Sequence, residues 1–174
     1  FDNARVFDNT RVYGNATVFN NAWVYGTARV FDNARIFDNA RVFDNVRVYG
    51  TATVFNNAQV SGTARVYGDA RVYGDARVYD NTWVYGDARV YGDVHVYGDA
   101  RVSGDAIVLK TPPRVSRSDG YDFIVVPCAD NQYRVIAGCR YFTFDEAYEH
   151  WNKNHSNYEE TVLILKYLFL QKDN

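Results

Sequence analysis

A six-residue repeat runs without a break from Phe1 to Val108 and limits what this chain can fold into. Every sixth position is valine except Ile36, and the residue two places earlier is small, most often alanine. The typical unit is Ala-Arg-Val-Tyr-Gly-Asp, and eighteen units follow one another with no insertion or deletion. Such regularity predicts one short structural unit stacked many times.

The order of residues within the unit predicts a strand and a corner. The small residue and the valine are two positions apart, which puts both side chains on one face of a strand. The arginine and the aromatic residue beside the valine then point to the other face. The remaining pair, such as Gly-Asp or Asp-Asn, is typical of turns because Gly and Asn tolerate a positive φ. We therefore expect a strand of about four residues and a two-residue corner.

The number of units in one coil is indicated by a longer repeat. The segment ATVFNNA occurs at 16–22 and again at 52–58, an offset of six units, or two coils if each coil holds three strands. The array would then be six triangular coils about 4.8 Å apart, paired in parallel and in register. The predicted interior consists of Val6, Val12, Val18, Val24, Val30, Ile36, Val42, Val48, Val54, Val60, Val66, Val72, Val78, Val84, Val90, Val96, Val102 and Val108.

This pattern of aliphatic and small residues resembles the hexapeptide-repeat family, in which each coil belongs to a left-handed parallel β-helix. The resemblance covers residues 1–108 and implies left-handed winding, an exception to the usual right-handed crossover. It also implies assembly as a trimer, which is common among members. The best-known members are acyltransferases that use acetyl- or acyl-coenzyme A at clefts between subunits, with a histidine as general base.

The register stops at Leu109, and Pro112-Pro113 mark a boundary. We expect a mainly β chain with a solenoid at 1–110, a linker at 111–120 and a small α+β cap with ββαα order at 121–174. The segments DFIVVP and QYRVIAG predict two strands joined by a hairpin around 129–131. The cap would cover the last coil, whose open edge invites aggregation.

Two helices are predicted after these strands. Thr143 is a plausible N-cap of the first helix, with Glu146 at the capping-box position. The second is expected over 158–171, with its apolar positions at Val162, Leu165, Leu168 and Phe169. The segment AGCRYFTFDEAYEHW is similar to a tail found on hexapeptide-repeat proteins of bacteria and their phages.

The outward residues sort into three faces, one for each strand of a coil. The second face, which begins at Arg11, has the fullest column of arginines. Its candidate binding residues are Arg29, Arg47, Arg65, Tyr49, Tyr67 and Tyr85. Rings about 4.8 Å apart can stack, and arginines beside them can add cation–π contacts. Exposed aromatic patches are typical of interfaces, which favours a homo-oligomer, either a trimer or a filament. Capture of a protein partner or of a small anionic ligand such as a nucleotide is the alternative, and the ladders could also act only to stabilise the strands.

Enzymatic activity is disfavoured by the same residues, although an acyltransferase of the hexapeptide-repeat type stays a second alternative. His95 lies at an outward position usually held by arginine, and no protruding loop shapes a cleft around it. His150 and His155 lie in the tail, and no Ser or Cys nucleophile stands at a spacing from them that is typical of a catalytic pair. We therefore assign no catalytic residue and no cofactor.

Metal, nucleic-acid and membrane binding are disfavoured by composition. Cys128 and Cys139 lack the spacing of a zinc site, and the acidic corners lack the calcium-binding repeat pattern. The net charge is −2, and twelve Asp offset eleven Arg in the array. No apolar run approaches the roughly 20 residues that cross a bilayer. Phe1 falls in mid-pattern and the chain has no Met, so we expect a natural start upstream and a cytoplasmic location or a place in an assembled particle.

Overall fold

The computed structural model describes residues 3–128, 130, 132–138, 140–151 and 156–172. The chain divides into two compact units, Phe1–Thr111 and Pro112–Asn174. The boundary lies at the pair of prolines that ends the repeat. The first unit contains only short strands, and the second contains a small sheet and two helices.

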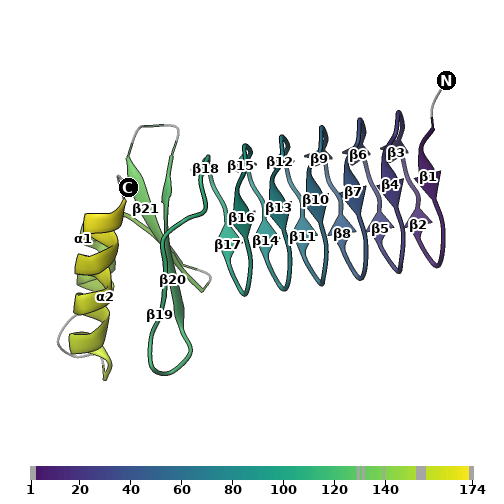
Figure 1. Cartoon of the computed structure of the whole chain (residues 1–174). Coiled ribbons are helices and arrows are strands. Elements are labelled where there is room, and N and C mark those ends of the chain that lie inside the picture. Colours follow the sequence, from purple (N-terminus) through teal and green to yellow (C-terminus); the bar gives the residue numbers. More distant parts are fainter. Residues whose placement is uncertain (1–2, 129, 131, 139, 152–155, 173–174) are drawn as a thin grey trace. The chain divides into compact units, whose positions relative to one another are not determined.

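The first unit is a parallel β-solenoid made of three six-stranded sheets (Figure 1). Strands of one sheet are three apart in chain order, so each coil contributes one strand to every sheet. The first sheet holds β1 (Arg5–Val6), β4 (Trp23–Val24), β7 (Arg41–Val42), β10 (Gln59–Val60), β13 (Arg77–Val78) and β16 (His95–Val96). The second holds β2 (Arg11–Val12), β5 (Arg29–Val30), β8 (Arg47–Val48), β11 (Arg65–Val66), β14 (Trp83–Val84) and β17 (Arg101–Val102). The third holds β3 (Thr17–Val18), β6 (Arg35–Ile36), β9 (Thr53–Val54), β12 (Arg71–Val72), β15 (Arg89–Val90) and β18 (Ile107–Val108).

Strand pairing confirms the coil of three repeat units. Val60 pairs with Val42 on one side and with Val78 on the other, and every pair in the array keeps this interval. The regular strands are only two residues long, shorter than expected. The backbone pairing still extends beyond them, because the N–H of Phe43, just after β7, donates to the carbonyl of Val60 at 3.0 Å. Each coil therefore satisfies its backbone groups on its neighbours.

The interior is filled by the small and aliphatic residues of the repeat. The valines from Val24 to Val108, with Ile36, are buried, as are the alanines between them. The interior assignment does not hold for the first coil, where Val6 is 47% and Val12 36% exposed and Val18 is half-buried. These three valines pair with a coil on one side only, so nothing covers their other side among the described residues.

After each strand of the first sheet the chain turns a corner, and from coil to coil the first residue of this corner alternates between aspartate and glycine. Every corner of this column begins with a residue at positive φ, such as Asp44 at 63° and Gly62 at 69°. The Asp44 carboxylate accepts the Gly62 N–H of the next coil at 3.1 Å. A Cβ at Gly62 would lie only 2.8 Å from the backbone nitrogen of Asp80. An aspartate in one coil thus accepts a hydrogen bond from the glycine of the next coil. The glycine, having no Cβ, avoids a clash with the backbone of the coil after it.

This crowding gives a testable difference between two glycines. Gly62→Ala is expected to lower the free energy of unfolding by about 2–4 kcal/mol, because left-handed strain adds to a backbone clash. Gly120 also has a positive φ, of 83°, but a Cβ there would meet nothing within 4 Å. Gly120→Ala should therefore cost only about 1 kcal/mol of strain. Thermal and urea unfolding of both variants measure the difference, and equal losses would contradict the steric argument.

The second unit contains a four-stranded antiparallel sheet in the order β19-β20-β21-β22. Its strands are β19 (Arg114–Ser116), β20 (Asp122–Pro127), β21 (Tyr133–Ala137) and β22 (Arg140–Phe142). The sequence predicted only β20 and β21, and their connection includes positions 129 and 131, which lie outside the described residues. The segment expected to be a linker, 111–120, contains β19, because Val115 pairs with Phe123.

Both helices follow the sequence prediction. Helix α1 (Phe144–His150) begins with the expected capping box, in which Thr143 and Glu146 bond each other's backbone. Helix α2 (Tyr158–Gln171) has the predicted bounds. Its buried face differs from the prediction, because Thr161 and Ile164 are buried with Leu165 and Leu168, whereas Phe169 is 48% exposed. No helix among the described residues is long and apolar enough to cross a bilayer.

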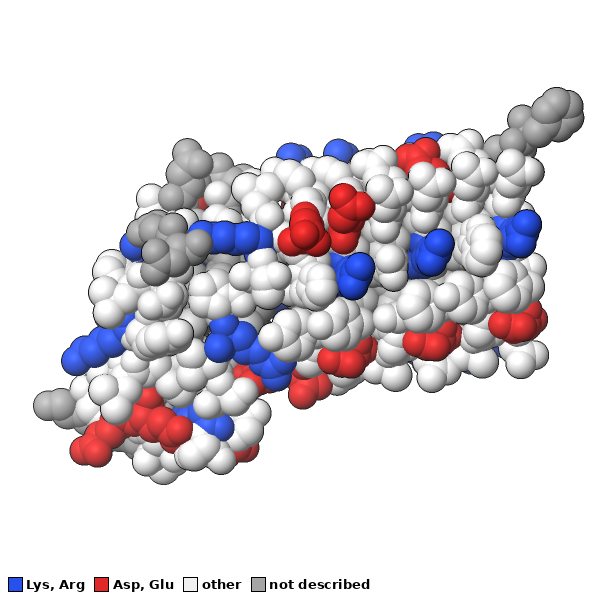
Figure 2. Space-filling view, in the orientation of Figure 1, with Lys and Arg blue, Asp and Glu red and all other residues white. Residues whose placement is uncertain are grey.

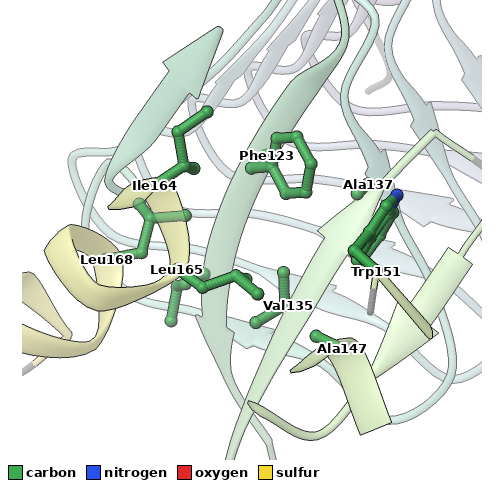
Figure 3. Packing of buried hydrophobic residues seen from close by; sticks show 9 residues of the cluster. Phe123, Val135, Ala137, Ala147, Trp151, Ile164, Leu165 and Leu168 are labelled. Carbon is green, nitrogen blue, oxygen red and sulfur yellow. The ribbon is translucent and has the colours of Figure 1, made fainter. Parts of the chain in front are cut away.

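The core of the second unit lies between the sheet and the helices (Figure 3). Phe123 of β20 is fully buried, and its ring meets the Trp151 ring edge-on at 5.1 Å. Leu165 and Leu168 approach from α2 and Ala147 from α1. This core consists only of residues of the second unit, so each unit has an apolar interior of its own.

A buried arginine joins the turn after β19 to α2. Arg117 is 7% exposed and donates to Asp119 at 2.7 and 2.9 Å and to the Thr161 hydroxyl at 2.9 Å. Its guanidinium also lies 5.1 Å from the centroid of the Tyr121 ring. The turn is held a second time where Ser118 donates from its backbone N–H to Glu160 at 2.7 Å. These contacts join segments that are far apart in the sequence.

Candidate binding face

The six candidate binding residues lie together on the second sheet of the solenoid. Arg29, Arg47 and Arg65 are direct neighbours on β5, β8 and β11. The rings of Tyr49 and Tyr67 stack at 4.9 Å, and those of Tyr67 and Tyr85 at 5.0 Å, with interplanar angles of 1° and 4°. The face is thus a column of guanidinium groups beside a column of stacked rings. Both columns repeat once per coil.

The pKa of Tyr67 is changed by its burial and by its neighbours on this face. Burial raises the pKa of Tyr67 above its ordinary value, and the neighbouring Tyr49 and Tyr85 raise it further, while Arg101 and Arg65 oppose the effect. The Tyr67 hydroxyl therefore stays protonated throughout the physiological pH range. At the middle of the column it is a neutral group that can donate or accept a hydrogen bond.

Tryptophan separates the arginines where the column would otherwise continue. Trp83 lies between Arg65 and Arg101, whose Cζ atoms are 4.5 and 4.8 Å from the centroid of its ring. Trp23 has the same place on the first sheet, between Arg5 and Arg41 at 5.0 and 5.5 Å. Like charges directly opposite on neighbouring strands repel, and cation–π contacts attract. Each tryptophan therefore replaces two repulsive contacts with two attractive ones, a role the sequence reading did not assign.

Extending the arginine column should cost stability in a salt-dependent way. Trp83→Arg would place a cation between Arg65 and Arg101 and remove both cation–π contacts. We expect a loss of about 1–2 kcal/mol at low ionic strength, part of which returns at high salt as the repulsion is screened. Urea unfolding at two salt concentrations measures this. The matched change Trp83→Leu removes the ring without adding charge, so its loss should not depend on salt.

The corners carry a second kind of ladder, made of amides. Asn21 donates to Asn39, Asn39 to Asn57 and Asn57 to Asp75, at 3.4, 3.2 and 3.0 Å. An open polar groove of about 570 Å³ runs along this corner. Because each amide bonds the next, the ladder adds a polar contact between successive coils at this corner.

The two described histidines, His95 and His150, belong to different units and are each in contact with an aromatic ring. The backbone N–H of His95 donates to the Thr111 hydroxyl at 3.1 Å, and its ring meets Tyr79 edge-on at 6.2 Å. His150 packs against Trp151 at 4.7 Å between ring centroids, and His155 lies outside the described residues.

The described cysteine and carboxylate side chains are not grouped as metal ligands. Cys128 is buried with its Sγ 2.8 Å from the Tyr141 hydroxyl, and Cys139 lies outside the described residues. Within the part of the chain that the structure describes, no three His, Cys, Asp or Glu side chains are grouped as metal ligands.

The first sheet shows a pattern with twice the period of the coil. Its outward column alternates between Arg5, Arg41 and Arg77 and the uncharged or weakly basic Trp23, Gln59 and His95. Figure 2 shows cationic side chains separated by uncharged ones along the solenoid, with a parallel row of acidic side chains. Both rows recur at every second coil, as the ATVFNNA segment does.

One family model agrees with this geometry. The model of the YdcK β-solenoid repeat matches residues 10–26, 34–50, 64–80, 70–86, 83–98 and 94–109. No curated protein matches the chain. Among solved structures, a candidate acetyltransferase of Bacillus cereus is 11% identical, with 97% of this chain and 88% of that chain covered and a TM-score of 0.31. The array is thus a parallel β-solenoid of hexapeptide repeats, three to a coil, and over these residues it matches the YdcK β-solenoid repeat.

Proposed function

We propose that the protein is a non-catalytic structural scaffold that self-associates through its outward aromatic and arginine faces. The observation that carries this proposal is the constancy of the corners. From the first described coil to the last, each corner is a tight turn with a residue at positive φ. The outside of the solenoid is therefore formed by side-chain columns on three regular faces.

Rigidity supports a scaffold role. Every inner coil bonds to a coil on each side through all three sheets, and the interior from Ala22 to Val108 is filled with small side chains that are apolar except for Thr82. Side-chain ladders at the corners and on the faces add contacts between the same coils. Bending such a body would break several of these contacts at once. A stiff surface loses little conformational entropy when it binds, which favours association.

The second sheet is the face we assign to self-association. Tyrosine, tryptophan and arginine, which this face repeats, are the residues enriched at the energetic centres of interfaces. Charge complementarity supports a second copy as the partner. Asp69 and Asp87 are exposed at the corner after this sheet, one coil apart, with the same interval as Arg47 and Arg65. A second copy aligned along the solenoid can match its aspartates to these arginines coil by coil.

Sedimentation equilibrium of the purified chain tests the proposal, together with one variant on each of two faces. Tyr67→Ser removes a ring from the second sheet and copies the natural Ser61, so the coil should still form. We expect an oligomer for the unaltered chain and at least a tenfold weaker association for Tyr67→Ser. Tyr73→Ser, on the third sheet, is the matched control and should associate normally. A monomer at every accessible concentration would overturn the proposal, and equal weakening by both variants would overturn the choice of face.

A further inference from the structure

One coil of the first sheet has neither an arginine nor a ring among its outward side chains. The repeat places Gln59 where its neighbours on β7 and β13 have arginine, and Ser61 where they have a ring. Of the ladder positions in the described coils, Ser61 is the one without a ring that has a ring on each side, Phe43 before it and Tyr79 after it. Two changes on one coil leave a gap in the surface.

The backbone beneath the gap keeps the geometry of the array. The N–H of Ser61 donates to the carbonyl of Val78 at 2.9 Å, as the N–H of Phe43 does to Val60 at 3.0 Å. Gly62 begins the corner at the usual positive φ and donates to Asp44. The coils therefore do not close up over the missing ring. The gap spans two coil intervals, about 9.6 Å at the standard strand spacing.

The rings of Phe43 and Tyr79, on either side of the gap, each stack on the next ring of the column, away from the gap. The Phe43 ring stacks on Tyr25 at 5.0 Å with an interplanar angle of 4°. The Tyr79 ring stacks on Tyr97 at 5.4 Å and 13°, and His95 meets it edge-on. Elsewhere in the ladders one ring per coil fills the same interval. A single flat ring inserted over Ser61 would thus stack on both walls with the spacing that the array already uses.

The polar groups around the slot indicate what the ring would carry. Ser61 and Gln59 belong to the coil of the gap, and their hydroxyl and amide groups offer hydrogen-bond donors and acceptors. Arg41 and Arg77 flank Gln59 on the adjacent strands β7 and β13. A ligand there meets two aromatic walls, hydrogen-bonding groups and positive charge.

We propose that this slot binds a flat heteroaromatic ring with an anionic substituent, the chemistry of a nucleoside monophosphate. The ring stacks between Phe43 and Tyr79, its polar edge bonds Gln59 and Ser61, and its anionic group lies toward Arg77. The slot is on the first sheet, so its occupation does not depend on association through the second.

Isothermal titration with AMP, adenosine and inorganic phosphate tests the slot. AMP should bind with one site per chain and adenosine at least threefold more weakly, and phosphate alone should show no binding. Ser61→Tyr fills the gap with the side chain found in other coils, so the protein should stay folded and lose at least tenfold in AMP affinity. Equal binding of AMP by Ser61→Tyr and by the unaltered chain would overturn the proposal.

A gain-of-function variant distinguishes binding in the slot from nonspecific binding of AMP to the protein surface. Tyr67→Ser opens a gap between Tyr49 and Tyr85 on the second sheet, so AMP stoichiometry should rise from one to two. If stoichiometry stays at one and Ser61→Tyr has no effect, the ring is bound elsewhere and the proposal fails. If Ser61→Tyr changes the mass of the protein without ligand, a side chain of a second copy occupies the slot, which also overturns the proposal for a small ligand.

Discussion

Replacing Val66 with aspartate is expected to unfold the solenoid. Val66 is fully buried on β11, between Val48 and Val84 on the adjacent strands. A carboxylate there would face valine and alanine, and the buried hydroxyl of nearby Thr82 already donates to the Tyr79 carbonyl at 2.8 Å. Burying an unpaired charge is among the most costly single changes. We expect a loss of about 4–5 kcal/mol or more, which is a large part of the stability of a typical domain. Circular dichroism should show the β signal lost at temperatures where the unaltered chain is folded.

The matched control is the residue next to it. Arg65→Ala removes an outward side chain from the same strand and should change the free energy of unfolding by about 1 kcal/mol or less, mainly through the contact with Trp83. Conservative Val66→Ala should lie between the two, at about 1–3 kcal/mol, because it leaves a small cavity. Similar damage from Val66→Asp and Arg65→Ala would mean that the inward and outward assignments are wrong.

Removing the guanidinium of Arg117 should destabilise the second unit. Arg117→Met keeps an apolar stem but removes the bonds to Asp119 and Thr161, and it leaves a buried hydroxyl with one partner fewer. We expect a loss of about 1–3 kcal/mol, mainly from the buried bond between the Arg117 guanidinium and Thr161, because a buried hydrogen bond to a charged group is among the stronger ones. The melting of α2, followed by the helical circular dichroism signal, measures the effect. Arg140→Met changes an exposed arginine of the same sheet and should cost about 0.5 kcal/mol or less.

The pH dependence of the same variant gives an independent check. Hydrogen bonds from Arg117 lower the pKa of Asp119 from 3.8 to about 2. The contact therefore favours folding at pH values above the ordinary pKa, and that contribution is lost as the pH falls through about 2. The difference in melting temperature between Arg117→Met and the unaltered chain should shrink between pH 4 and pH 2. A difference that is constant over this range would show that the ion pair contributes nothing.

The regular part of the fold follows from the sequence because each repeat reports the environment of its own residues. The interval between Ala40 and Val42 places both inside, and the strict spacing of the valines predicts stacked coils. The exposure of Val6 could not be read from the same pattern. It depends on whether a coil lies on both sides of the residue, which is a property of the position in the stack and not of the repeat.

The candidate face was predictable only in part. The column of Arg29, Arg47 and Arg65 follows from counting in steps of one coil, and so does the stack of tyrosines beside it. The same count places arginines on both sides of Trp83. The sequence alone does not show why tryptophan replaces arginine there, because the reason lies in the contacts of its ring with Arg65 and Arg101. In the second unit, no local pattern marks Arg117, because its partner Thr161 is 44 positions away. The polar segment around Arg117 was therefore predicted to be a linker, since its contacts with helix α2 are not visible in the local sequence.

The constant step of three repeat units per coil makes the solenoid a molecular ruler. Adding or removing one whole coil changes its length by about 4.8 Å and leaves every column on its own face. Adding or removing a single repeat unit keeps the valines inside but rotates all later residues by one face, so the arginines of the second sheet would join the column of a neighbouring sheet. Length and surface pattern can therefore be varied separately, by indels of whole coils for the first and of single repeat units for the second.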